Sequence, residues 1–396
     1  MWGLSSSSVS AQGVAASADW SAWERAERVP RSGEGAGFDQ DHRDDLEQFA
    51  ALGCTDWRLT IEWARIEPLP GRVDTDAVDR YRDICAHARR VGLRTWLTLH
   101  HGSLPGWYLD DEGGHRDTGA RGRFWARHVD RVAEVFDDLC DGWVPIDDPI
   151  GWAIRGYGLG TRPPGRSDPG AMREAIRGAV LAVEEAVRLL ASGRQPIMTA
   201  WRADTVHAAP LDDGRIAPEA RAAATRWDAL LWDTWLSAHG EGVLDVEGGG
   251  ARPVPALHTE VDIVGLVHDH PVGVDAAGRL VPWPARAPRD AGGFAPEPAE
   301  LAEAVHRAAD SLPDHPIALA GHGVATTDDD WRDQLLARSL DHVRDARDHI
   351  GLVGYFHDSG IDGYEWTNGF SGPRGLITRD RSVKPSAARF LHAAGS

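Results

Sequence analysis

The 396-residue sequence has little cysteine and no long apolar run. Its three cysteines, Cys54, Cys85 and Cys140, lie far apart and show none of the close spacing of a metal site. This pattern is typical of reduced, buried thiols and predicts a cytoplasmic protein. No stretch of eighteen apolar residues is present, so we expect no membrane-spanning helix. The first residues also lack the basic and apolar segments of a signal peptide.

Positive charge is scarce as well. The chain has 42 basic residues against 61 acidic ones, which gives a net charge of −19. A chain of this charge is repelled by polyanions, which argues against nucleic acids and anionic membranes as partners. Only one basic residue, Lys384, is a lysine, a usage typical of GC-rich bacterial genomes. The hydrophobic content of 42% is that of an ordinary globular protein.

Short apolar or β-branched runs alternate with long amphipathic stretches, which predicts repeated βα units. The expected strands span residues 2–4, 58–63, 94–100, 142–147, 196–200, 262–267, 316–320 and 351–356. The expected helices span residues 76–91, 121–140, 171–192, 217–239, 298–312 and 329–349. Residues 275–295, which are rich in proline, glycine and arginine, are interpreted as a long βα loop.

Eight βα units without a linker or an internal repeat predict an α/β fold, a single (β/α)8 TIM barrel domain over residues 1–396. In such barrels the carboxyl ends of the strands and the following loops form the active site. The residues at the end of each expected strand are therefore the candidates for function. No ligand spacing such as His-x-x-x-His occurs among His100, His101 and His268, and we expect neither a metal nor a cofactor.

Several motifs resemble those of glycoside hydrolase family 1, the retaining β-glycosidases. Residues 58–68 (RLTIEWARIEP) are similar to the family's R-F-S-x-x-W-x-R-x-x-P strand, and residues 98–105 (TLHHGSLP) to its T-L-x-H-x-D-L-P segment. Residues 354–366 (GYFHDSGIDGYEW), 374–376 (RGL) and 384–387 (KPSA) resemble its C-terminal signature. Because these matches run along nearly the whole chain in the family's order, the resemblance implies the family's barrel and a sugar-sized pocket.

The resemblance also implies which side chains contact a sugar. The family's residue types are retained at Arg58, His101, Glu365 and Trp366. Other pocket positions differ: Ser10 stands in place of a sugar-binding glutamine, and Asp358 in place of the tryptophan that floors the sugar site. Residues 267–269 (VHD) stand in place of Asn-Tyr-Tyr. The departures therefore gather in the expected pocket.

Both catalytic positions of the resembled family are changed. Residues 147–149 (DDP) stand in place of Asn-Glu-Pro, so Asp148 replaces the acid/base glutamate. Residues 320–323 (AGHG) stand in place of Thr-Glu-Asn-Gly, so Gly321 replaces the nucleophile. A retaining glycosidase needs two carboxyl groups about 5–5.5 Å apart, and glycine cannot attack an anomeric carbon. We therefore do not expect retaining β-glucosidase hydrolysis.

Two other chemistries remain open. An inverting mechanism needs an acid and a base about 6.5–9.5 Å apart, with Asp148 as the acid and Asp269 or Asp358 as the base. Alternatively, a pocket dense in titratable groups carries out a different acid–base reaction. The candidate catalytic residues are Asp148, Asp269 and Asp358. The candidate substrate-binding residues are Arg58, His101, Asp147, His322, His357, Glu365 and Trp366.

Arg58 has more than one expected role. In the resembled family this arginine orients the nucleophile, and Gly321 frees it to pair with Asp148 or Asp269 or to bind an anionic substrate group. The sequence thus predicts a diverged enzyme that acts on a small glycoside or another polar ring compound by non-classical acid–base chemistry. The alternative is a catalytically inactive pseudoglycosidase that binds a sugar or a partner protein. The sequence does not predict an oligomeric state.

Overall fold

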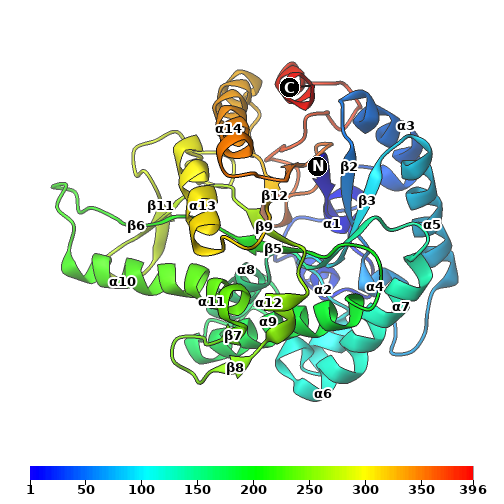
Figure 1. Ribbon diagram of the computed structural model, residues 1–396, viewed down its shortest axis with the longest axis horizontal. Helices are drawn as coiled ribbons and strands as arrows, with labels where there is room; N and C mark the ends of the chain where they lie inside the picture. Colours follow the sequence, from blue (N-terminus) through cyan, green and yellow to red (C-terminus); the bar gives the residue numbers. More distant parts are fainter. Residues whose placement is uncertain (396) are drawn as a thin grey trace.

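The computed structural model describes residues 1–395, and its centre is a closed barrel of eight parallel strands (Figure 1). In hydrogen-bonded order they are β4 (Gly142–Ile146), β3 (Arg94–His100), β2 (Asp56–Thr60), β1 (Trp2–Ser6), β13 (Gly354–Asp358), β12 (Ile317–His322), β9 (Ile263–Val267) and β5 (Met198–Arg202). Backbone bridges from Trp143 to Ile197 and from Asp147 to Ala200 join β4 to β5 and close the ring. The predicted (β/α)8 TIM barrel is therefore confirmed.

The strands were placed well by their apolar runs, and their ends less well. β3 has the predicted bounds, whereas β2 begins two residues earlier, and β5 and β13 end two residues later, than expected. Polar residues occupy these misplaced ends, at Asp56, Arg202 and Asp358. Hydrophobicity reports where a strand is buried in the core, while backbone pairing continues to the barrel rim.

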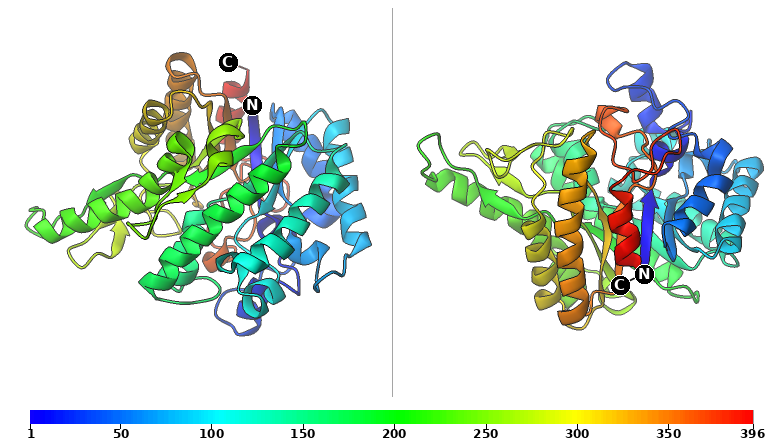
Figure 2. Two further views of the ribbon diagram at one scale, coloured as in Figure 1. Left: turned by 60° about the horizontal axis from the view of Figure 1, so that its bottom comes forward. Right: turned by 90° about the horizontal axis from the view of Figure 1, so that it is seen from above.

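Helices cover the outside of the barrel (Figures 1 and 2). The longer ones are α3 (Phe38–Ala51), α5 (Thr75–Arg90), α7 (Ala126–Phe136), α9 (Pro169–Leu190), α10 (Pro218–Asp228), α13 (Pro298–Ser311) and α14 (Asp329–His349). The shorter ones are α1 (Ser8–Gln12), α2 (Asp19–Arg25), α4 (Trp63–Ile66), α6 (Thr118–Ala120), α8 (Pro149–Ala153), α11 (Thr234–Glu241), α12 (Pro255–Thr259) and α15 (Ala387–Ala394). Within residues 1–395, none of the helices has the length and apolarity needed to cross a membrane.

Local sequence sets where the long helices begin and where one of them is interrupted. The side chains of Asp74, Asp168 and Asp328 cap α5, α9 and α14, each accepting the backbone N–H of the residue three positions later. The helix predicted over residues 217–239 is in fact α10 and α11, joined by a π-helical turn at Ala229–Asp233. Amphipathic spacing alone does not distinguish a continuous helix from one that contains a π-turn.

The barrel interior is a packed core and not a channel. It is filled by Trp96, Val144, Met198, Ala200, Val267, Ala318, Ala320 and Phe356. The two ends of the chain lie near each other (Figure 2), because β1 pairs with β13 and the ring of Trp2 packs against Phe390 of α15 with centroids 4.8 Å apart. The interior packing closes the barrel below its mouth, so any ligand must bind at the rim.

A small second sheet extends to one side of the barrel beside α10 (Figures 1 and 2). It contains β6 (Val206–Ala208), β10 (Val272–Val274) and β11 (Leu280–Pro282), and a separate two-stranded pair joins β7 (Val243–Leu244) to β8 (Arg252–Pro253). The interpretation of residues 275–295 as a loop was therefore wrong at β11, which pairs antiparallel with β10. Its Leu-Val-Pro run is too short to be distinguished from loop by periodicity.

Candidate functional site

A cavity of about 580 Å³ opens at the carboxyl ends of the barrel strands. This volume lies in the range of about 300–1,000 Å³ that is usual for small-molecule sites. The strand-end residues that line it include Arg58, Asp147, Asp148, Arg202, Val267, Gly321 and Asp358. The strands β10 and β11 of the outer sheet add an apolar side wall with Val272, Leu280 and Val281. The cavity lies at the strand ends, where the site was expected from the sequence, and its assignment as the functional site stays a prediction.

Arg58 and Asp147 form a buried ion pair across the floor of the cavity. The guanidinium of Arg58, on β2, donates a hydrogen bond to Asp147 at the end of β4. Burial raises the pKa of Asp147, but the charge and hydrogen bond of Arg58, together with His101, outweigh burial and hold that pKa below its ordinary value. The expected partners of Arg58, Asp148 and Asp269, were therefore wrong. The end of β4, which is separated from β2 by β3, supplies the partner instead.

Asp148 is held by three donors. Its Oδ1 accepts the backbone N–H of Gly151 at 2.9 Å, and its Oδ2 accepts from Arg155 at 2.7 Å and Arg202 at 2.8 Å. The backbone at Asp148 is left-handed (φ 50°, ψ 60°), an uncommon conformation for a non-glycine residue. It turns the chain from β4 into α8 and keeps the carboxylate at the cavity wall.

These contacts fix the charge of Asp148. Burial raises its pKa, but the charges of Arg202 and Arg155 outweigh burial and lower it to about 2. A carboxyl group with this pKa carries no proton near neutral pH and has no strong tendency to accept one. The role of general acid that the sequence suggested for Asp148 is therefore not supported by its surroundings, because two arginines from outside the motif neutralise it.

Gly321 leaves open space at the end of β12. A Cβ built there meets its nearest neighbours, Arg58 and Val267, at 3.5 Å, which is ordinary van der Waals contact. The position therefore does not require glycine for steric reasons. A carboxylate side chain at this position would lie beside Arg58, but the glycine supplies no nucleophile.

A second charge network spans the opposite side of the cavity. Arg374 donates a hydrogen bond to Asp269, and its Nε lies 3.4 Å from Asp358. Arg202 also approaches Asp269, at 3.7 Å, and the hydroxyl of Ser5 donates to Asp358 at 3.1 Å. Burial raises the pKa of Asp269, but the charges of Arg374 and Arg202 dominate and lower it well below its ordinary value. Asp269 is thus an ionised structural partner, which leaves Asp358 as the more accessible of the two carboxylates.

The remaining wall combines aromatic rings with weakly charged groups. His101 lies with its ring 5.9 Å from that of Trp366, edge to face, and the guanidinium carbon of Arg162 lies 4.5 Å from the Trp366 ring. Burial lowers the pKa of His101, which favours neutral imidazole. Burial raises the pKa of Glu365 well above its ordinary value, and the negative charge of Asp358 adds to that effect. Glu365 is therefore the cavity carboxyl that most readily keeps its proton.

Comparisons with known proteins assign the fold to a family. Residues 2–242 match the model of glycosyl hydrolase family 1, which is more than half of the chain. The chain belongs to glycosyl hydrolase family 1. Asp148 and Gly321 can therefore be compared with the catalytic positions of family 1.

Individual relatives are distant. Thermostable beta-glucosidase B of Thermobispora bispora is 25% identical over 385 residues, covering 86% of this chain and 76% of that protein. Beta-glucosidase 6 of rice is 30% identical over 131 residues, and the alignment spans 32% of this chain but only 25% of the rice protein. The beta-glycosidase of Pyrococcus horikoshii superimposes with a TM-score of 0.88 at 24% identity, covering 100% of this chain and 93% of that one. Sequence identities of this size show that this chain shares the fold of these proteins, but they do not assign an activity to it.

Two histidines that were predicted to bind substrate lie behind the family 1 cavity. The register of β12 shifts after Leu319, so Gly321 faces the cavity although Ala320 points into the barrel interior, and His322 faces the helices. Along β13 the side chains alternate regularly from the interior Phe356, which turns His357 outward while Asp358 faces inward. The assignments of His322 and His357 to the substrate site were therefore wrong, because every residue near a strand end had been treated as facing the mouth.

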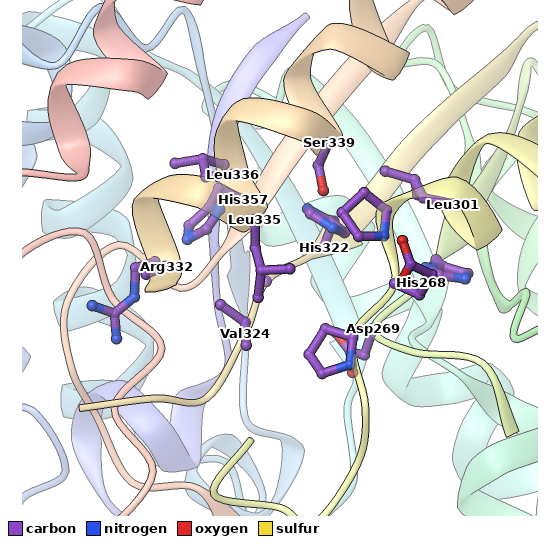
Figure 3. A pocket seen from close by; sticks show the side chains of 14 residues that line it. His268, Asp269, Leu301, His322, Val324, Arg332, Leu335, Leu336, Ser339 and His357 are labelled. Atoms are coloured by element: carbon purple, nitrogen blue, oxygen red, sulfur yellow. The ribbon is translucent and has the colours of Figure 1, made fainter. Parts of the chain in front are cut away.

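The outward histidines line a separate cavity of about 20 Å³ between the barrel and the helices α13 and α14 (Figure 3). That volume is enough for a single water molecule. The hydroxyl of Tyr355 lies 3.1 Å from Nδ1 of His322 and 3.4 Å from Nδ1 of His357. Burial lowers the pKa of His322 to about 3, and His268 beside it adds to that effect. These neutral histidines lie in a polar contact region between the barrel and the helices α13 and α14.

Four arginines of the cavity wall were not among the predicted site residues: Arg155, Arg162, Arg202 and Arg374. Two signals could have found them. The first is that Arg202 ends β5 and Arg374 comes after β13, and the second is that Arg155 and Arg162 lie in the segment that follows the changed acid/base position. In the part of the chain that the structure describes, no group of three His, Cys, Asp or Glu residues could hold a metal ion.

Proposed function

We propose that this chain binds a small glycoside or another polar ring compound at the mouth of its barrel without hydrolysing it by the retaining mechanism. The observation that carries the proposal is the state of Asp148, whose carboxylate accepts hydrogen bonds from Gly151, Arg155 and Arg202. An ionised, fully bonded carboxylate cannot protonate a departing glycosidic oxygen. The chain therefore lacks the acid step.

The covalent step is missing for an independent reason. Gly321 stands at the end of β12, where a nucleophile would face Arg58, and its position is empty of any side chain. Removing a covalent nucleophile costs an enzyme several orders of magnitude in rate. The loss of both steps supports the pseudoglycosidase alternative over the enzyme prediction.

The binding half of the proposal is supported by the part of the pocket that is retained. His101, Glu365 and Trp366 all line the cavity, as they would in a sugar site. Edge-to-face contact between His101 and Trp366 fixes an aromatic corner, and Glu365 supplies a hydrogen-bonding carboxyl beside it. A pocket with a few polar groups on an aromatic wall is suited to a hydroxylated ring.

A second candidate function is acid–base turnover by Glu365 and Asp358. The observation that favours it is the raised pKa of Glu365, caused by burial and then by Asp358. Asp358 instead accepts a hydrogen bond from Ser5 and lies beside Arg374. Two carboxyl groups of one cavity with such different environments can divide the roles of acid and base.

Calorimetric titration with glucose and phenyl β-glucoside, followed by chromatography of the same samples, tests both functions. We expect saturable binding and unchanged ligand after prolonged incubation. Trp366→Ala should abolish binding, whereas Trp331→Ala, which removes a tryptophan from the start of α14 outside the cavity, should not. Product formation that disappears in Asp358→Asn and Glu365→Gln would support the second candidate. Absence of binding by any neutral or charged glycoside would contradict both.

A further inference from the structure

One arginine of the cavity wall has no counter-charge. Arg58, Arg155, Arg202 and Arg374 each form an ion pair with a carboxylate. Arg162 lines the same cavity, and its side chain forms no ion pair or hydrogen bond with any of residues 1–395. Its close contact is with the Trp366 ring, 4.5 Å from the guanidinium carbon. Stacking restrains the guanidinium and leaves its N–H groups unbonded.

The surroundings of Arg162 add positive charge and do not balance it. Asp148 is already shared between Arg155 and Arg202, at 2.7 and 2.8 Å. Burial and then the charge of Arg155 lower the pKa of Arg162 well below its ordinary value, which is the response of a cation without a neutralising partner. Glu365, the other nearby carboxyl, has a raised pKa and favours its neutral form. This end of the cavity therefore has an excess of positive charge.

The backbone holds Arg162 in place before any ligand arrives. The N–H groups of Thr161 and Arg162 donate to the carbonyl of Arg155 at 2.9 and 3.3 Å, and the N–H of Gly165 donates to the carbonyl of Arg162 at 2.8 Å. Arg155 itself lies in a π-helical turn, Ile154–Gly158, that follows α8. Insertions of this kind are common at functional sites, where they re-aim side chains. The turn positions Arg155, and the hydrogen bonds to its carbonyl hold Arg162 at the same wall.

We propose that the ligand of this pocket is a ring compound that carries an oxyanion, such as a carboxylate, sulfate or phosphate, and that the free guanidinium of Arg162 binds that group. This inference rests on the proposed binding function and narrows its ligand class. The fork of N–H donors on an arginine matches two oxygens of such a group, and hydrogen bonds to charged groups are the stronger ones. A neutral glycoside would leave Arg162 uncompensated in the complex.

Calorimetry with four probes tests the inference: phenyl β-glucoside, phenyl β-glucuronide, and the 6-phosphate and 6-sulfate of phenyl β-glucoside. We expect at least one anionic probe to bind about tenfold to a hundredfold more tightly than the neutral one. Arg162→Gln should reduce that preference to within about threefold, and Arg162→Lys should retain only part of it because lysine lacks the fork. Thermal unfolding of the free variants verifies that both are folded.

Arg28→Gln is the matched control, since Arg28 also stacks on a tryptophan, Trp23, with its guanidinium carbon 5.0 Å from the ring, but outside the cavity. It should leave the anion preference intact. Equal affinity for neutral and anionic probes would overturn the inference while leaving the proposed function standing. An anion preference that survives in Arg162→Gln would overturn the assignment to Arg162. Inorganic phosphate and sulfate alone should bind far more weakly than the ring compounds; equal binding would contradict the claim that the ring is recognised.

Discussion

Asp148→Asn removes the negative charge that Arg155 and Arg202 share, while keeping a side-chain oxygen for the N–H of Gly151. The carboxylate is only 3% exposed, and its two arginine partners are 24% and 16% exposed, so solvent screens the interaction weakly. The variant leaves two partly buried guanidinium groups without their shared counter-charge. We therefore expect a loss of stability, and not only a change in chemistry.

The size of the expected stability loss follows from the pKa of Asp148, which falls from an ordinary 3.8 to about 2. At about 1.36 kcal/mol per pH unit, this difference contributes about 2.5 kcal/mol to the free energy of unfolding. Because the folded-state pKa is depressed, the contribution is fully present above about pH 4 and is lost as the pH falls towards about 2. At pH 3 roughly 1 kcal/mol of it should already be lost.

Urea unfolding followed by tryptophan fluorescence at pH 7, 5 and 3 measures this effect. Asp148→Asn should unfold with about 2–3 kcal/mol less free energy than the natural chain at pH 7, and the difference should narrow at pH 3. Asp138→Asn removes a carboxylate from an exposed pair with Arg82 and should cost much less. Equal stability of Asp148→Asn and the natural chain at pH 7 would refute the ionised, doubly paired state and restore Asp148 as a candidate acid.

Three further outcomes follow from the cavity. Gly321→Glu places a carboxylate beside Arg58 and should release dinitrophenolate from 2,4-dinitrophenyl β-glucoside, which absorbance measures. Phenyl β-glucoside should stay intact by chromatography, because its leaving oxygen needs a proton. Cleavage of both substrates would show that an acid is present. Glu365→Gln should weaken the pH dependence of the free energy of unfolding. The raised pKa of Glu365 contributes stability that is lost as the pH rises through that pKa. Between pH 5 and 9 the free energy of unfolding should therefore decline less in the variant than in the natural chain. His322→Ala should lower stability by about 1–3 kcal/mol yet leave the calorimetric affinity for glycosides unchanged, because His322 lies behind the cavity; weakened binding would place it back in the site.

The barrel could be predicted because apolar runs and helix periodicity repeat along the whole chain. The cavity position followed from the same pattern, since strand ends in a barrel share one rim. Which side of a strand each residue faces was harder to infer. Gly321 and Asp358 face inward, whereas His322 and His357 face outward. Alternation from the interior Phe356 would have excluded His357, whereas His322 faces outward only because the register of β12 shifts after Leu319, which no sequence pattern showed.

The electrostatic state of the site could not be predicted from local sequence. Asp148 is fixed by Arg155 from a π-turn and by Arg202 from the neighbouring strand, and no spacing rule links these residues. Arg58 was expected to pair elsewhere, yet it binds Asp147 at the end of β4, with β3 between the two strands. Such pairs depend on side-chain geometry at the rim, which becomes visible only when strands and loops are assembled.

Intact-protein mass spectrometry after treatment with 2,4-dinitrophenyl 2-deoxy-2-fluoro-β-glucoside tests most directly whether any carboxylate of this chain accepts a glycosyl group. With Gly321 at the end of β12, the natural chain should keep its unmodified mass after long incubation. Gly321→Glu serves as the positive comparison and should gain the mass of one fluoroglycosyl group. A stoichiometric adduct on the natural chain would contradict the absence of a nucleophile and return the protein to the retaining glycosidases.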